Sequence, residues 1–394
     1  MAMEQTVSAR RLVTGVGVIE YPVVRTDADG RIAEIWSDPS LRSDETLTPA
    51  FLDVHTHGAA GHDLMDATSV GMAAIGRFYA ARGVGSYLAT TLTAPMDATL
   101  RSLEELAGAV ERADRPAEAT PVGIHIEGPF VSHAKKGMHP AEWILPPTVA
   151  VFDRMWEAAR GTIRLMTIAP EAPGAMEVIG RAVAVGVRVS IGHSNATAAE
   201  ARAAIQAGAK SATHTFNAMR ALDHREPGIL GVVLDEADLY AELICDGVHV
   251  APEMMRLWWK AKGDERGVLV TDSMAATGMP DGEYVLGGVA VHVAGGVCTT
   301  AGTVGLLAGS VSAGSVLAGS VLTMDRAVAN LRAHTGMALE TAVRMGSTNP
   351  ARMLGIAGIG ELRVGDAANL NRFDRAGRLV GTYLRGEAVA GTSR

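Results

Sequence analysis

Cysteine is scarce in this chain of 394 residues, which contains only Cys245 and Cys298. Two cysteines are too few for the disulfide framework of a secreted scaffold, and such low usage suits a reducing compartment. The N-terminal segment contains Arg10 and Arg11, but no apolar run of signal-peptide length follows before Glu20. We therefore expect a cytoplasmic protein.

An excess of positive charge is also missing. The chain has 35 Lys and Arg residues against 43 Asp and Glu residues, which gives a formal net charge of -8 and a pI near 5.9. Nucleic acids and anionic membrane surfaces bind basic patches, so neither is expected as the main partner. An anionic substrate would need local cations to hold it.

The sequence has no convincing membrane span. Residues 301–322 are uncharged over a length that could cross a bilayer, but most of them are Gly, Ala, Ser and Val. Within this run Ala-Gly-Ser-Val recurs every five residues from Ala308, Ala313 and Ala318, and this period matches no solenoid repeat. We expect a buried or loop-forming segment that contains a local duplication.

The chain does have enough apolar residues for a large core. Hydrophobic residues make up 48% of it, and a chain of this size buries roughly three quarters of its unfolded-state surface. Eight apolar β-type runs alternate with helix-length segments, and Gly83, Gly186 and Gly208 precede three of the runs. The runs are residues 50–54, 85–91, 122–127, 163–168, 187–191, 211–215, 241–245 and 268–271.

This alternation predicts an α/β fold, a parallel (β/α)8 barrel of the TIM type. Residues up to about 49 alternate apolar and polar, and short β-type runs return after Gly360. We expect both end segments to pair in one second, small β domain. The predicted boundaries are 1–49 and 346–394 for the small domain and 50–345 for the barrel.

Potential metal ligands follow or end several of these runs. His55 and His57 follow the first run and are two residues apart, so both side chains leave the same face of the strand. Glu127, His193 and His214 lie at the tips of three others. Because the C-terminal strand ends of a barrel meet on one face, we expect the five side chains to converge.

One carboxylate and two imidazoles match a catalytic metal site with three protein ligands and a position open for water. Taken singly, Glu127 is more typical of a buried ion pair, each histidine is more typical of a core histidine, and His55 and His57 are more typical of a loop pair. Their shared position at strand tips favours metal binding. A metal there would lower the pKa of water to about 7, which predicts a hydrolase.

Other residues could bind substrate or transfer protons. Asp272 directly follows the last run and could act as general base and then as general acid, or cap the following turn. His139 follows the Glu127 tip and could polarise a carbonyl group. Arg225, His224 and His249 could bind phosphate or carboxylate, or form a solvated surface cluster.

Together these motifs resemble the N-acetylglucosamine-6-phosphate deacetylases of the amidohydrolase superfamily, from about Leu12 to Gly386. The motifs are His-Thr-His-Gly from His55, His-Ile-Glu-Gly-Pro-Phe from His125, Lys-Lys-Gly-Met-His-Pro from Lys135, Ile-Gly-His-Ser from Ile191, Thr-His-Thr-Phe-Asn-Ala-Met from Thr213, His-Arg-Glu-Pro-Gly from His224, Asp-Gly-Val-His-Val from Asp246 and Thr-Asp from Thr271.

The resemblance implies that Glu127, His193 and His214 hold the principal metal, and that His55 and His57 allow a second. It also implies that Asp272 is the catalytic carboxylate and that His139 assists at the acetyl group. The implied substrate-binding residues are His139, Asn217, Ala218, Arg225, His249 and Leu307. Arg225 would reach the site from the other subunit of a homodimer.

The implied reaction removes acetate from N-acetylglucosamine 6-phosphate, with one or two divalent ions as cofactor. Zinc is expected first, while iron, manganese and cobalt also accept these ligands. Departures from the family pattern at residues 219–223 and 308–320 leave a second substrate open, the galactosamine epimer or another N-acyl compound. An inactive metal-binding assembly protein is the alternative outside the enzymes, and the presence of both Asp272 and Arg225 speaks against it.

Overall fold

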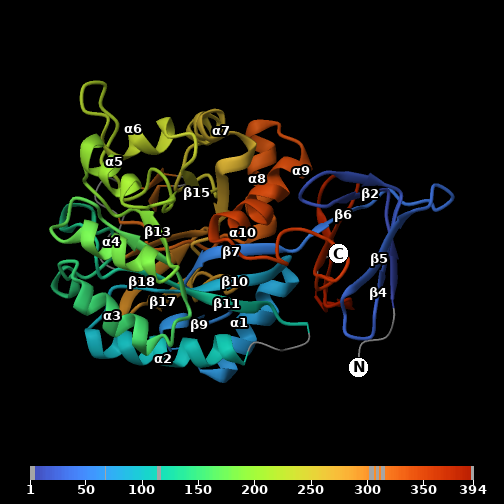
Figure 1. The fold of residues 1–394 in the computed structure, drawn as a ribbon, viewed down its shortest axis with the longest axis horizontal. Helices are drawn as coiled ribbons and strands as arrows, with labels where there is room; N and C mark the ends of the chain where they lie inside the picture. The colour runs from blue at the N-terminus through green and yellow to red at the C-terminus, as the bar shows by residue number, and fades with distance from the viewer. Residues whose placement is uncertain are drawn as a thin grey trace.

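The computed structural model describes residues 5–66, 68–112, 117–300, 306–307, 310–311 and 316–391. A parallel sheet lies at its centre with helices around it, and smaller β-sheets built from the two end segments lie at one side (Figure 1). The arrangement confirms the predicted fold class, an α/β barrel with a small additional β unit.

Eight parallel strands form the central sheet in the order β16-β15-β14-β13-β12-β11-β10-β7. Each strand corresponds to one predicted run. Backbone hydrogen bonds from Asp272 N to His55 O (2.9 Å) and from His57 N to Ser273 O (2.7 Å) bring the two outer strands together. The strands are β7 (Phe51–Thr56), β10 (Val84–Thr91), β11 (Thr120–Glu127), β12 (Ile163–Ile168), β13 (Arg188–Ile191), β14 (Ser211–Ala212), β15 (Tyr240–Ile244) and β16 (Gly267–Val270).

Helices connect consecutive barrel strands, as a parallel sheet requires. Thr68, Thr148 and Thr197 cap three of them by accepting a hydrogen bond from a backbone N–H in the first turn. The helices are α1 (Ser69–Ala81), α2 (Met96–Glu111), α3 (Val149–Ala158), α4 (Ala175–Ala184), α5 (Ala198–Gln206), α6 (Gly228–Asp235) and α7 (Pro252–Arg266), followed by α8 (Met324–Thr335), α9 (Leu339–Gly346) and α10 (Thr348–Leu354).

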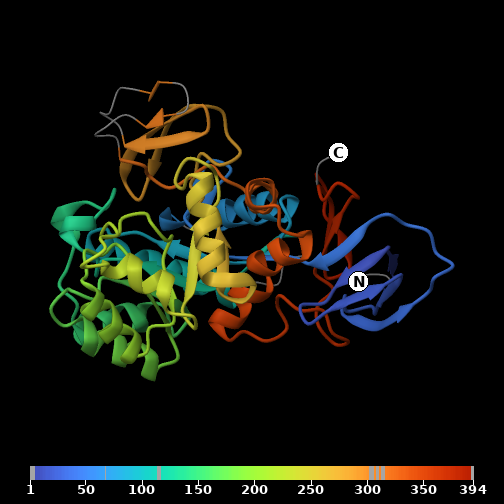
Figure 2. The ribbon, with the colours of Figure 1, turned by 90° about the horizontal axis from the view of Figure 1, so that it is seen from above.

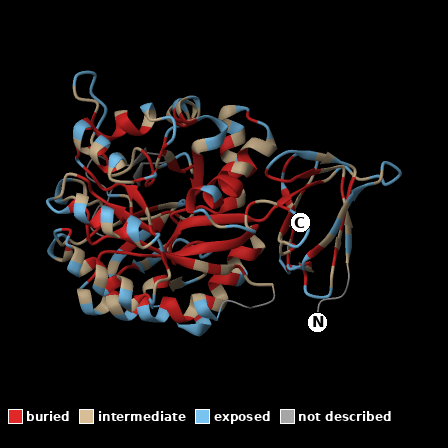
Figure 3. Ribbon diagram, in the orientation of Figure 1, coloured by how far each residue is buried: buried red, intermediate tan, exposed pale blue. Residues whose placement is uncertain are grey.

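The core lies between the barrel strands and their helices (Figure 3). Every residue of β7 and of β10 is buried, as expected for strands covered on both faces. Polar residues are buried with them, and many belong to the strand tips at one end of the barrel. The barrel therefore provides a rigid support for side chains at these tips.

The two end segments of the chain pair with each other. In the order β24-β23-β22-β6-β2-β3, the antiparallel pair of β6 and β22 joins them. A second sheet has the order β1-β4-β5. The strands are β1 (Thr6–Ser8), β2 (Arg11–Val13), β3 (Val18–Glu20), β4 (Pro22–Thr26), β5 (Ile32–Ser37), β6 (Thr46–Pro49), β22 (Leu370–Phe373), β23 (Leu379–Leu384) and β24 (Glu387–Ala388). The domain boundaries stay a prediction.

A further antiparallel sheet was not expected from the sequence. Strands β17 (Gly282–Leu286), β18 (Val289–Ala294) and β19 (Val297–Thr300) form an antiparallel meander. Figure 2 shows it as a separate layer beside the barrel, away from the sheets of the end segments. Its buried residues pack against Leu92 and Met274, next to the barrel mouth.

Short elements complete the described structure: β8 (Gly58–Ala59), β9 (His62–Asp63), β20 (Leu306–Leu307), β21 (Ser310–Val311) and the 3-10 helices η1 (Leu64–Asp66), η2 (His133–Lys135) and η3 (Ala141–Trp143). Much of the predicted duplication from Ala308 lies outside the described residues. In the described part of the chain, no helix combines the length and the apolar character needed to cross a membrane.

Candidate metal and catalytic site

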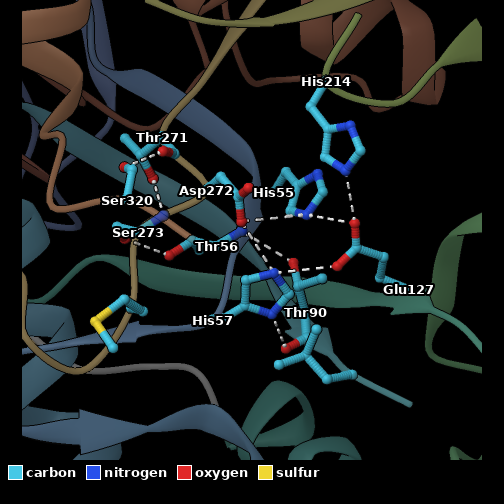
Figure 4. A network of polar contacts seen from close by, with 12 residues as sticks. His55, Thr56, His57, Thr90, Glu127, His214, Thr271, Asp272, Ser273 and Ser320 are labelled. Carbon is cyan, nitrogen blue, oxygen red and sulfur yellow. Dashed lines mark hydrogen bonds and ion pairs between the residues drawn. The ribbon is translucent and has the colours of Figure 1, made fainter. Parts of the chain in front are cut away.

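The strand tips place five histidine and carboxylate side chains around one point at the C-terminal end of the barrel. Figure 4 shows four of them, together with Asp272, facing each other. His55 lies in β7 and Glu127 ends β11, while His57 directly follows β7. His193 and His214 each follow their strand by two residues. Convergence, predicted from the strand pattern alone, is therefore present in the structure.

Three of these site residues have an unusual backbone conformation. The φ angles of His193, His214 and Asp272 are 45°, 27° and 51°. Positive φ is uncommon for residues other than glycine and is typically maintained only where the surrounding structure enforces it. At these tips the turn directs the side chain back over the barrel mouth.

The spacing of Glu127, His193 and His214 fits a single metal ion. Glu127 Oε1 lies 3.2 Å from His193 Nε2 and 3.0 Å from His214 Nε2, and the two nitrogens are 3.0 Å apart. Metal–ligand bonds of about 2.0–2.2 Å in a tetrahedral shell place neighbouring ligand atoms about 3.3–3.6 Å apart, a few tenths of an ångström more than these separations. The three residues therefore suit a common divalent ion.

His55, His57 and Asp272 form a second group whose ligand atoms lie within 4.8 Å of one another. Asp272 Oδ1 lies 3.1 Å from His57 Nε2 and 3.7 Å from His55 Nε2. His55 Nε2 is buried and has no hydrogen-bond partner among the described residues, although Glu127 Oε1 is 3.3 Å away. A buried nitrogen lone pair without a partner is what a metal ligand requires.

The electrostatics of the site agree with bound positive charge. Burial by itself would raise the pKa of Glu127, but His55, His193 and His214 hold it well below its usual range. Burial likewise opposes protonation of His57, yet hydrogen bonds to Asp272 and Glu127 raise its pKa to about 9. In each case the buried carboxylates are stabilised by a nearby positive charge. A divalent metal ion can supply that charge in place of the protons on the histidine rings.

His139 differs from the metal-facing histidines. Burial, with the nearby charge of His193, lowers its pKa to about 3, so the ring is neutral at pH 7. Its Nδ1 lies 2.7 Å from Thr93 Oγ1 and 3.4 Å from Thr93 N, which can only donate. The proton therefore belongs on Nε2, which lies 3.8 Å from Glu127 Oε2. In this form His139 can donate a hydrogen bond to a substrate oxygen.

A cavity of about 400 Å³ opens above these side chains. Asn217, Ala218 and His249 line it, as do both predicted catalytic residues. His249 Nδ1 is held by Asp246 Oδ2 at 2.7 Å. Arg225 is exposed on the loop before α6 and does not belong to this cavity lining. The side chain of Leu307 lies outside the described part of the structure.

Two buried carboxylates at the site were missed by the sequence interpretation. Asp53 accepts a hydrogen bond from Thr271 Oγ1 at 2.6 Å, and burial raises its pKa to about 7. Glu242 lies next to His55 in the middle of β15. Both residues lie within strands, whereas the sequence pattern indicates ligands only at strand tips. A charged residue inside an apolar run was the available signal.

Sequence comparison matches residues 46–389 to the Amidohydrolase family. The chain belongs to this family. A resemblance to the family's N-acetylglucosamine-6-phosphate deacetylases, predicted from the motifs, is confirmed by relatives across nearly the whole chain.

Among curated relatives, N-acetylgalactosamine-6-phosphate deacetylase of Escherichia coli is 38% identical, covering 98% of this amidohydrolase and 100% of the relative. N-acetylglucosamine-6-phosphate deacetylase of Lysinibacillus sphaericus is 39% identical, covering 86% and 85%. A solved structure of a mutant N-acetyl-D-glucosamine-6-phosphate deacetylase from Mycobacterium smegmatis, in complex with N-acetyl-D-glucosamine-6-phosphate, superposes with a TM-score of 0.90. Its identity is 34%, covering 98% of this chain and 100% of that one.

Metal addition is expected to stabilise this amidohydrolase because the folded site binds the ion and the unfolded chain does not. At a free metal concentration 100-fold above the dissociation constant, the gain is about 2.7 kcal/mol. We expect Glu127→Gln to lose most of it, and the exposed variant Glu105→Gln to retain it. Thermal unfolding of chelator-treated protein with and without Zn²⁺ measures the effect. An equal gain in all three proteins would contradict the assignment of Glu127.

Proposed function

We propose that this amidohydrolase removes the acetyl group of N-acetyl-D-glucosamine 6-phosphate, giving D-glucosamine 6-phosphate and acetate. The observation that carries the proposal is the convergence of Glu127, His193 and His214 with Asp272 around one cavity. The match to relatives of that activity over nearly the full chain supports the same substrate class.

In this proposal the cofactor is one or two divalent ions, most simply zinc, with iron, manganese or cobalt also compatible. Glu127, His193 and His214 hold the first, and His55 and His57 with Asp272 hold a second. Such an ion, when bound, lowers the pKa of water and polarises a carbonyl group. In this proposal the reaction takes place in the cytoplasm.

The chain's own residues then transfer the protons. Burial would raise the pKa of Asp272, but the charge of His55 and a hydrogen bond from His57 lower it. Asp272 is therefore a carboxylate at neutral pH, and it takes a proton from the attacking water. The water oxygen joins the acetyl carbon, the carbon–nitrogen bond breaks, and Asp272 returns the proton to the leaving amine.

Residues that line the cavity contact the acetyl group and the sugar phosphate. The Nε2–H group of neutral His139 donates to the acetyl oxygen as negative charge develops there. Asn217, Ala218 and His249 hold the sugar phosphate from the other side. Arg225, which lies away from the cavity of its own chain, provides the phosphate-binding guanidinium to the partner site in a homodimer.

A second candidate substrate is N-acetylgalactosamine 6-phosphate, because the relative that acts on it is 38% identical and is covered over its full length. Acetate release from the two epimers by metal-stripped protein, with each divalent ion added back, separates the two. We expect the glucosamine epimer to have the higher kcat/KM. A higher value for the galactosamine epimer would reverse the assignment, and no release from either would refute the proposed function.

Asp272→Asn is expected to keep the ion held by Glu127, His193 and His214 and to lose turnover. The amide retains the shape of the side chain but cannot accept the proton of water, so kcat should fall about 10²–10⁴-fold. Steady-state kinetics and metal analysis on the same sample measure both quantities. An unchanged kcat would remove Asp272 from the mechanism.

Arg225→Ala is expected to raise KM for the phosphorylated sugar far more than for its unphosphorylated analogue, because only the phosphate pairs with the guanidinium. Arg202→Ala is a matched control, since Arg202 is an exposed arginine that pairs with Asp235 on the surface. Kinetics with both substrates test this. Equal losses for the two substrates would exclude a phosphate contact.

A further inference from the structure

Glu242 is a fully buried carboxylate in the interior of the barrel. It lies in the middle of β15, two residues before the end of the strand, and has no exposed surface. Its only ion pair among the described residues is with His55, and its Oε1 atom has no hydrogen-bond partner there. Burying a carboxylate that has no Lys or Arg partner costs free energy of folding, unless a neighbouring group carries positive charge.

The contacts of Glu242 determine how His55 is protonated. Glu242 Oε2 lies 3.1 Å from His55 Nδ1, and a carboxylate can only accept, so in a neutral, metal-binding His55 ring the single proton lies on Nδ1. The lone pair of Nε2 then faces the site, 3.3 Å from Glu127 Oε1 and 3.7 Å from Asp272 Oδ1. The His57 ring makes the corresponding contact with an uncharged acceptor, because its Nδ1 lies 3.3 Å from the carbonyl oxygen of Thr90.

The same oxygen also supports a second ligand. Glu242 Oε2 accepts a hydrogen bond of 3.2 Å from the backbone N–H of His214. His214 has a positive φ of 27°, a conformation that needs support from its surroundings. One carboxylate therefore joins the orientation of the His55 ring to the backbone of His214.

We propose that Glu242 is a positioning residue that fixes His55 with Nε2 toward the metal and so sets metal affinity at the group of His55, His57 and Asp272. This rests on the proposed function only in taking that group to hold a divalent ion. Carboxylate contacts of this kind fix the imidazole tautomer and make the ligand nitrogen more basic. The reaction itself needs no contact with Glu242.

The test is calorimetric titration of Zn²⁺ into chelator-treated protein, with metal content measured after dialysis. Glu242→Leu removes the acceptor, and at least one bound equivalent should weaken 10–100-fold. Glu242→Gln should lose less, since its amide oxygen can still accept the Nδ1 proton. Ser211→Ala, on the neighbouring strand, removes a buried hydroxyl with no partner among the described residues and should bind like wild type.

Wild-type affinity and stoichiometry in a folded Glu242→Leu protein would overturn the proposal. If that variant does not fold, Glu242→Asp decides, because the shorter side chain withdraws the carboxylate from Nδ1. It should also bind metal more weakly than Glu242→Gln, and wild-type affinity in it would be equally decisive. Wild-type protein that binds metal but releases no acetate refutes the deacetylase function alone, whereas a chain that binds no divalent ion overturns both proposals.

Discussion

Negative charge buried among imidazole rings is the constraint on which the site depends. Glu127 and Asp272 are buried at the barrel mouth and Glu242 is buried within β15. In the described part of the chain each of the three forms ion pairs only with histidines. Histidines compensate this charge only when protonated, whereas a divalent cation compensates it and leaves the rings as neutral ligands. Metal dependence therefore follows from the protein's own charge arrangement.

The barrel supplies the geometry that this constraint requires. Parallel strands end on one face, so residues distant in the sequence are brought within 3–4 Å of one another. Asp53 connects the first barrel strand to the residue after the last one, because it accepts hydrogen bonds from both His55 N (3.3 Å) and Thr271 Oγ1 (2.6 Å). The first and last barrel strands are thereby aligned where His55 and Asp272 meet.

The sequence predicted the repeating parts of the molecule well, because strand periodicity and glycine-ended helices are local signals. Gly83, Gly186 and Gly208 all have positive φ, as expected of residues that end helices. Side chains at strand tips could be assigned to one site, because the fold class determines where the strand tips meet. Glu242 could not be grouped in this way, since its role depends on a ring from β7, which lies far away in the sequence. The β17–β19 meander was missed because its strands are short and separated by glycines. The homodimer contact of Arg225 stays a prediction.

The most direct measurement is a crystal structure of metal-loaded protein with anomalous data at the absorption edge of the bound metal. We expect a peak about 2.0–2.2 Å from the ligand atoms of Glu127, His193 and His214. A protein that is metal-loaded in solution but has its peak elsewhere, or that shows these three side chains turned away from the ion, would contradict it.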